Sequence, residues 1–160
     1  MKQNKKGFTL IELLAVMVIL GVIMAIAIPA MTGYINDSKK DSMVSTALNL
    51  LSAATDRITA NNALPVSGQS VYMKVSDIEL SKGGTSPYTN QKFTDVSVVR
   101  VTNTNGVYKY EIYLVDGNNN CLTATEQQLN ASTDAKRDLV KTQVCGGSIT
   151  NNCCPVINAS

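Results

Sequence analysis

The sequence contains no histidine, the side chain that serves most often as a general base near neutral pH and as a metal ligand. It also contains no tryptophan. The serines have no recognisable partner that would activate them as nucleophiles. Asp95, Asp116 and Glu126 do not follow the spacing of a calcium loop. We therefore expect a protein that is not an enzyme and that binds no cofactor and no metal.

An excess of charge of one sign is lacking as well. The chain has 14 basic and 12 acidic residues, and Lys2, Lys5 and Lys6 stand close together at the N-terminus. Without these three lysines, 11 basic residues are set against 12 acidic ones, so the rest of the chain is near neutral. Because nucleic-acid-binding proteins carry a broad basic surface, no nucleic acid contact is predicted. Low charge suits a subunit that packs against copies of itself.

A long apolar run follows the N-terminal lysines. From Phe8 to Ile28 every residue is apolar, glycine or threonine except Glu12. As a helix this run would be about 30 Å long, which is the thickness of the hydrocarbon core of a bilayer. The lysines before it predict a cytoplasmic N-terminus, with the remaining chain outside. A carboxylate inside such a helix costs about 2–3 kcal/mol, so Glu12 is expected to have a function.

The start of this run, Gly7-Phe8-Thr-Leu-Ile-Glu12, together with the lysine-rich segment before it, resembles the type IV pilin family. The resemblance implies a leader of residues 1–7 that a prepilin peptidase removes between Gly7 and Phe8. The same peptidase methylates the new amine of Phe8 in that family. It further implies that Glu12 pairs with the Phe8 amine of a neighbouring subunit in a filament, since residues four apart lie on one face of a helix.

Other interpretations of the N-terminus remain open. A secretory signal peptide could be cut after Ala25-Ile26-Ala27, or the run could be an uncut signal anchor. Glu12 would then be an interfacial glutamate whose side chain reaches toward the lipid head groups. A pseudopilin of a type II secretion or DNA-uptake system shares the same N-terminal motif. A signal-anchored extracytoplasmic binding module is a further alternative from another class.

The helical pattern continues beyond the apolar run. Apolar residues recur three and four positions apart, which predicts one buried face of an amphipathic helix. They are Met43, Ala47, Leu50 or Leu51, Ala54 and Ile58. We expect one helix from Phe8 to about Thr59, ended by Asn61-Asn62 and Pro65. The charged residues before the buried face, Asp37, Lys39, Lys40 and Asp41, are expected to be solvated.

Gly21, Pro29 and Gly33 are expected to interrupt this helix. A kink or local melting is expected at Pro29, because proline removes a backbone donor and clashes with the carbonyl of Ala25 one turn earlier. The resemblance to pilins implies that the helix unwinds between Gly21 and Pro29 during filament assembly. We expect residues 8–31 to form an apolar transmembrane and filament-core helix. Residues 32–160 are expected to form the globular pilin head, which includes the amphipathic second half of the helix.

The head is predicted to be rich in β-structure. Strands are expected at residues 71–75, 93–102, 107–115 and 121–124. Asn103-Thr-Asn-Gly106 carries a strong hairpin signal, and residues 116–120 form a second expected turn. Short helical character is expected around residues 134–140, and the C-terminal end is expected to be irregular. A long helix packed against a small antiparallel sheet is an α+β fold, with a cysteine-containing C-terminal region.

All four cysteines, Cys121, Cys145, Cys153 and Cys154, lie in the last quarter of the chain. An even number in a segment expected outside the cytoplasm favours disulfides, and three pairings are possible. A bridge between the adjacent Cys153 and Cys154 would be strained, which favours two bridges from Cys121 and Cys145 to that pair. A zinc site of four thiolates is the rival, although the usual spacing of zinc ligands is missing.

These features together lead to the prediction of a structural subunit of a type IV pilus. The resemblance implies a homo-oligomeric helical filament, a prepilin peptidase, a membrane assembly platform and an ATPase as partners. It also implies a single-pass protein of the cytoplasmic membrane before assembly and an extracellular filament afterwards. Cell adhesion and motility are the functions that such filaments serve.

Overall fold

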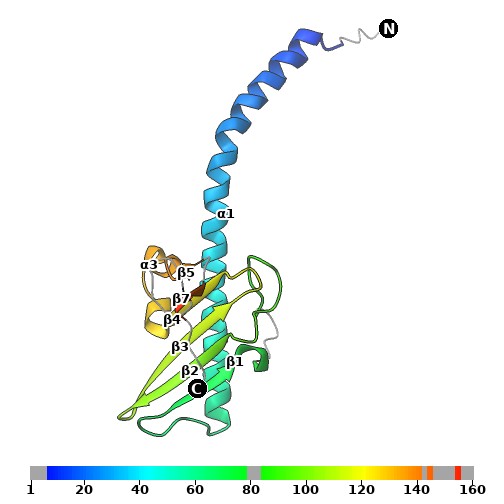
Figure 1. The fold of residues 1–160 in the computed structure, drawn as a ribbon. Helices are drawn as coiled ribbons and strands as arrows, with labels where there is room; N and C mark the ends of the chain where they lie inside the picture. Colours follow the sequence, from blue (N-terminus) through cyan, green and yellow to red (C-terminus); the bar gives the residue numbers. More distant parts are fainter. Residues whose placement is uncertain (1–6, 79–83, 142–143, 146–153, 156–160) are drawn as a thin grey trace, which may run out of the picture. The chain divides into compact units, whose positions relative to one another are not determined.

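A computed structural model describes residues 7–78, 84–141, 144–145 and 154–155 of the 160-residue chain. The backbone contacts divide the chain into two compact units, Met1–Asp37 and Ser38–Ser160. We call the first the N-terminal unit and the second the globular unit. Figure 1 shows the order of the elements along the chain. The long helix and the antiparallel sheet confirm the predicted α+β fold.

Helix α1 (Leu10–Ala60) contains 51 residues and is continuous. It begins two residues after the predicted start and ends one residue before Asn61-Asn62, as the sequence indicated. The predicted interruption at Gly21, Pro29 and Gly33 is absent from the isolated chain, because all three residues are helical. Proline removes only one backbone donor, and just beyond it the Thr32 hydroxyl donates to the Pro29 carbonyl at 2.8 Å. Unwinding in a filament therefore stays a prediction.

In the globular unit, α1 buries the face that its apolar spacing predicted. The buried residues are Met43, Val44, Ala47, Leu50, Leu51, Ala54 and Ile58. Most of them share one core with side chains from a single face of the sheet, among them Val99, Ile112 and Leu122. Burying a side chain such as Leu50 stabilises the fold by about 1.5–3 kcal/mol. This apolar core is the main contact between the helix and the sheet.

The sheet has five antiparallel strands in the order β1-β2-β3-β4-β5. The strands are β1 (Ser70–Lys74), β2 (Val98–Thr104), β3 (Val107–Val115), β4 (Cys121–Thr125) and β5 (Val140–Lys141). Four lie where strands were predicted, although β2 starts later than expected. The predicted strand residues 93–97 form a loop that buries Phe93. Strand β5 was not predicted, since its two residues are too few to show an alternating pattern.

The β2–β3 hairpin turns through two residues. Asn105 and Gly106 both have positive φ, 53° and 87°, which suits a two-residue turn between antiparallel strands. Asn103 belongs to β2, and its Oδ1 accepts a hydrogen bond from the Gly106 N–H at 2.8 Å. The predicted turn was therefore two residues too long. Asn-Gly alone supplies the left-handed backbone that the reversal needs.

The remaining described elements are short. They are the 3-10 helix η1 (Val75–Asp77), α2 (Glu126–Leu129), α3 (Thr133–Arg137), β6 (Val144–Cys145) and β7 (Cys154–Pro155). Strands β6 and β7 pair in parallel. The turn at 116–120 is confirmed: the carboxylate of Asp116, only 1 % exposed, accepts from the N–H groups of Asn118 and Asn120 at 2.9 Å. The Ser86 hydroxyl donates to the same carboxylate at 2.6 Å.

A disulfide joins Cys121 on β4 to Cys154 on β7, with the Cα atoms 6.1 Å apart. This bridge is one of those that the sequence left open, and it excludes a zinc site of four thiolates. The second predicted bridge would then join Cys145 to Cys153, and Cys153 lies outside the described residues. The bridged cysteines pack with Val98, Tyr113 and Val115 in a second apolar cluster. Cys154 of β7 thus packs on the sheet face opposite α1.

Two charged residues predicted to be solvated are bound instead. Arg137 of α3 donates to both carboxylate oxygens of Asp41 on α1, from Nε at 2.8 Å and from Nη2 at 2.5 Å. The Lys39 ammonium lies 5.6 Å from the centre of the Tyr88 ring. Both contacts join α1 to segments far along the chain, so local sequence patterns do not reveal them. Asp41 and Lys39 therefore help to attach α1 to the rest of the globular unit.

We expect Arg137→Ala to lower the thermal unfolding midpoint by a few degrees at neutral pH. The hydrogen bonds from Arg137 hold the pKa of the Asp41 carboxyl below its usual value. Such a carboxyl stabilises the fold above its unfolded pKa, and this contribution is lost as pH falls through the folded pKa. The difference between variant and wild type should therefore narrow below about pH 4. Thermal melts across pH test this. Lys74→Ala, which removes an exposed lysine on β1, is the control, and a difference that does not change with pH contradicts the expectation.

Candidate assembly site at the N-terminus

Thr9 caps the first turn of α1. Its N–H and its hydroxyl both donate to Glu12 Oε2 at 2.8 Å, and the Glu12 N–H donates back to the Thr9 hydroxyl at 3.3 Å. This reciprocal arrangement is a capping box, which satisfies backbone donors that a helix start leaves unpaired. It explains why α1 begins at Leu10 and not at Phe8. This role of Thr9 was not predicted, although a threonine followed three residues later by a glutamate is the sequence pattern of a capping box.

The capping box positions the Glu12 carboxylate. Both bonds that Thr9 donates end on Oε2. Within residues 7–78, 84–141, 144–145 and 154–155, no hydrogen bond ends on Oε1. Glu12 therefore has an oxygen available for a further donor while Oε2 holds the helix start. Phe8, which precedes the cap, is 91 % exposed.

The rest of the N-terminal unit presents apolar side chains on every side. Every residue from Gly7 to Asn36 is exposed in the isolated chain. By length and composition, α1 is the one helix among the described residues that could cross a membrane. Side chains such as Leu10 and Ile26, which are 82 % and 73 % exposed, need lipid or other apolar helices around them. This surface is suited to membrane anchoring.

The sequence-predicted site residues fall into separate groups. Gly7 and Phe8 lie just before α1, and Glu12 lies in its first turn. Apart from the adjoining residues, no atom lies within 4 Å of a Cβ placed on Gly7. Glycine is therefore not required at this position by packing within the chain. Gly21 and Pro29 lie farther along α1, whereas the cysteines belong to the globular unit. Among the residues that the structure describes, no three histidine, cysteine or acidic side chains are grouped to hold a metal.

Comparison with known families bears directly on this segment. Residues 2–28 match the family described as the prokaryotic N-terminal methylation motif. This stretch includes Gly7, Phe8, the capping box and the whole apolar run from Phe8 to Ile28. These residues carry the N-terminal signature of type IV pilins. The resemblance recognised from Gly7, Phe8 and Glu12 is thereby confirmed.

A curated relative agrees with this assignment. The chain is 30 % identical over 107 residues to the fimbrial protein EcpC of Eikenella corrodens. The aligned part is 67 % of this chain and 62 % of EcpC, so the chain spans less than two thirds of that relative's length. No solved structure matches the chain significantly.

Proposed function

We propose that this protein is a structural subunit of an extracellular type IV pilus. The observation that carries the proposal is that the methylation motif at residues 2–28 coincides with a helix exposed and apolar on all sides except at Glu12. In this proposal residues 1–7 are the leader and residues 8–31 the filament-core helix. Residues 32–160 are the part that the filament displays. A pilin-like protein is structural, and no catalytic step is invoked.

Assembly is proposed to join neighbouring subunits through Phe8 and Glu12. Cleavage after Gly7 would free a positively charged amine on Phe8. The Oε1 atom of Glu12 in the next subunit would accept a hydrogen bond from this amine, while Thr9 continues to hold Oε2. Surrounding apolar helices lower the local dielectric constant and strengthen the attraction. A subunit in the wrong register would leave both charges unpaired, which is costly in an apolar core.

The driving force in this proposal differs between lipid and filament. In lipid, an apolar helix gains little by leaving an apolar solvent, so the helices must gain from packing and from polar pairing. Outside the membrane, the helices in a filament core are shielded from water, and separating them would expose their apolar surface. The membrane platform, the ATPase and the peptidase implied by the resemblance would carry the subunit between these environments.

Processing is expected between Gly7 and Phe8. The match to the methylation motif and the exposed position of both residues support a cut there. Mass spectrometry of the mature chain should give Phe8 as the first residue, with a methylated amine. A mature chain that begins at Ile28 would indicate cleavage by signal peptidase and would contradict the proposal.

Filament membership separates this proposal from its alternatives. Electron microscopy with an antibody to the globular unit should label long surface filaments. Labelling of short periplasm-spanning structures alone would favour a pseudopilin. A chain found only as a membrane-anchored monomer would favour a signal-anchored binding module.

A further inference from the structure

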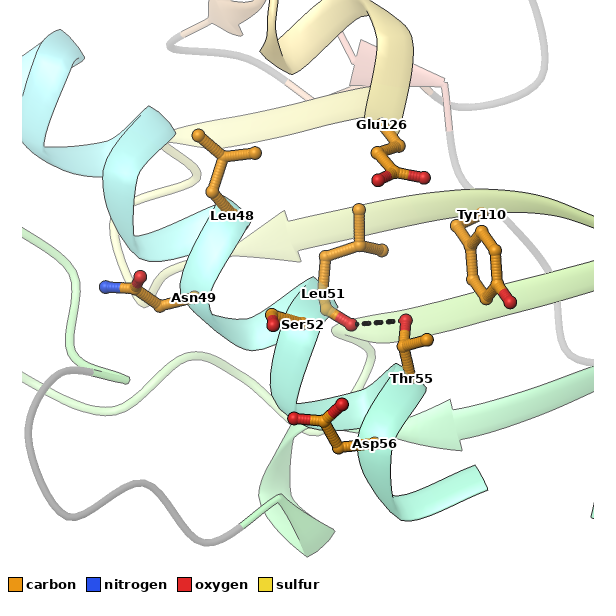
Figure 2. Close-up of a pocket in the computed structure, with 8 residues that line it drawn as sticks. All are labelled: Leu48, Asn49, Leu51, Ser52, Thr55, Asp56, Tyr110 and Glu126. Carbon is orange, nitrogen blue, oxygen red and sulfur yellow. Dashed lines mark hydrogen bonds between the residues drawn. The ribbon is translucent and has the colours of Figure 1, made fainter. Parts of the chain in front are cut away.

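A groove in the globular unit runs beside α1. It has a volume of about 380 Å³ and is lined by residues from α1, β3 and α2: Leu48, Asn49, Leu51, Ser52, Thr55, Asp56, Tyr110 and Glu126. Figure 2 shows Glu126 at one end and Asp56 at the other, with Leu51 and Tyr110 between them. The groove therefore combines an apolar middle with two carboxylates at its ends.

The basic side chains nearest in sequence do not neutralise this groove. Arg57 follows Asp56, but its guanidinium donates to the carbonyl of Asp77. Lys109 precedes Tyr110 on β3, and neighbouring residues of a strand point to opposite faces of the sheet. Because Tyr110 lines the groove, Lys109 faces away from it. Among the described residues that line the groove, none is basic.

A partner for this groove should offer a cation beside apolar surface. The exposed lysines of the described globular unit include Lys74, Lys92 and Lys109. Of these, Lys109 is the one that adjoins large exposed apolar side chains in the chain, namely Val107 at 61 % and Tyr108 at 38 % exposure. Val96 is also exposed, but it adjoins Asp95, whose negative charge would be repelled by the carboxylates of the groove.

The loop that follows α1 lies beside the β2–β3 hairpin and adds an exposed apolar side chain near Lys109. Val66, 63 % exposed, lies in the loop after α1. That loop is bonded to Asn103 of β2, which donates through Nδ2 to the Pro65 carbonyl at 2.9 Å and accepts from the Gly68 N–H at 2.9 Å. We call Val66 and residues 105–109 the tip. It carries exposed apolar surface and one lysine, with no acidic residue.

We propose that the groove of one subunit binds the tip of a second copy of this chain, with Lys109 lying between Asp56 and Glu126. The proposal rests on the proposed function, because it describes a contact between subunits of one filament. Groove and tip are different surfaces of the same chain. Such a contact is heterologous and adds subunits without closing on itself, as a filament requires. It would add a charge-selective contact to the one made by the N-terminal helices.

Charge reversal tests this contact in the full-length protein. Lys109→Glu, and separately Asp56→Lys combined with Glu126→Lys, would place like charges together. Each is expected to lower the yield of sheared filaments by up to about fivefold, because an exposed ion pair is worth at most about 1 kcal/mol in the free energy of a contact. Combining all three changes restores opposite charges and should recover most of the yield. Lys92→Glu, which reverses an exposed lysine outside the tip, should assemble normally.

Two further measurements keep the result interpretable. The amount and thermal stability of each subunit in the membrane fraction show whether a variant folds. In wild-type filaments, a carbodiimide should link Lys109 to Asp56 or Glu126 of another subunit as an amide, identified by mass spectrometry. Normal yields for the single-surface reversals, or no recovery in the combined variant, would overturn the groove contact while leaving the pilus proposal intact. A wild-type protein that forms no filaments would overturn both.

Discussion

Glu12→Ala is expected to abolish surface filaments or reduce them at least tenfold while the subunit remains in the membrane. Insertion should improve, because removing a carboxylate lowers the cost of residing in lipid by about 2–3 kcal/mol. Folding of the globular unit should not change, since Glu12 lies in the other compact unit. The affected contact would be the one between subunits, where the Phe8 amine would lose its partner. A shear preparation beside a membrane immunoblot measures both quantities.

The capping box makes a sharper version of this experiment possible. Glu12→Gln keeps a side-chain oxygen that can accept from the Thr9 N–H and hydroxyl but removes the negative charge. If charge pairing with the Phe8 amine drives assembly, Glu12→Gln should fail as Glu12→Ala does. Normal filaments from Glu12→Gln would show that the helix cap is sufficient. Loss of the subunit from the membrane fraction would place the fault in export or stability and would refute the assembly role as proposed.

Removing the Cys121–Cys154 disulfide is expected to be the most destabilising change in the globular unit outside its main core. The bridge closes a sequence separation of 33 residues. By constraining the unfolded chain, a bridge across a loop of this length adds about 3–4 kcal/mol to the free energy of unfolding. Cys121→Ala with Cys154→Ala avoids an unpaired thiol that could exchange with the remaining cysteines. Chemical denaturation should show a lower midpoint for this variant and a somewhat larger slope, because the unfolded chain without the bridge is less compact.

The position of the bridge also predicts where its loss acts. Cys121 and Cys154 are buried with Val98, Tyr113 and Val115 on the sheet face opposite α1. Without the bridge, the C-terminal segment should be the first part cut by protease, whereas the core between α1 and the sheet should remain protected. As a control, wild type treated with reductant should lose stability by a similar amount. An unchanged midpoint in both would contradict a structural role for the disulfide.

Local patterns in the sequence were sufficient to predict the long helix and the main strands. The apolar spacing from Met43 to Ile58 determined which face of α1 is buried, because a helix repeats every 3.6 residues whatever it packs against. Asn105-Gly106 determined the β2–β3 hairpin, since these residues accept the positive φ values that a two-residue turn needs. Gly7, Phe8 and Glu12 pointed to the pilin family because the motif is read within a few residues.

Only the tertiary structure decided which distant residues meet. Asp41 and Arg137 are 96 residues apart, and no local pattern couples them. Tyr113 lies on the same strand face as exposed Lys109, yet it is buried because the disulfide-linked Cys121 and Cys154 pack with it. The groove likewise needs α1, β3 and α2 together. Periodicity is a property of neighbouring residues, whereas these contacts depend on the path of the whole chain, and for that reason the sequence revealed the pilin-like helix but not the surfaces around it.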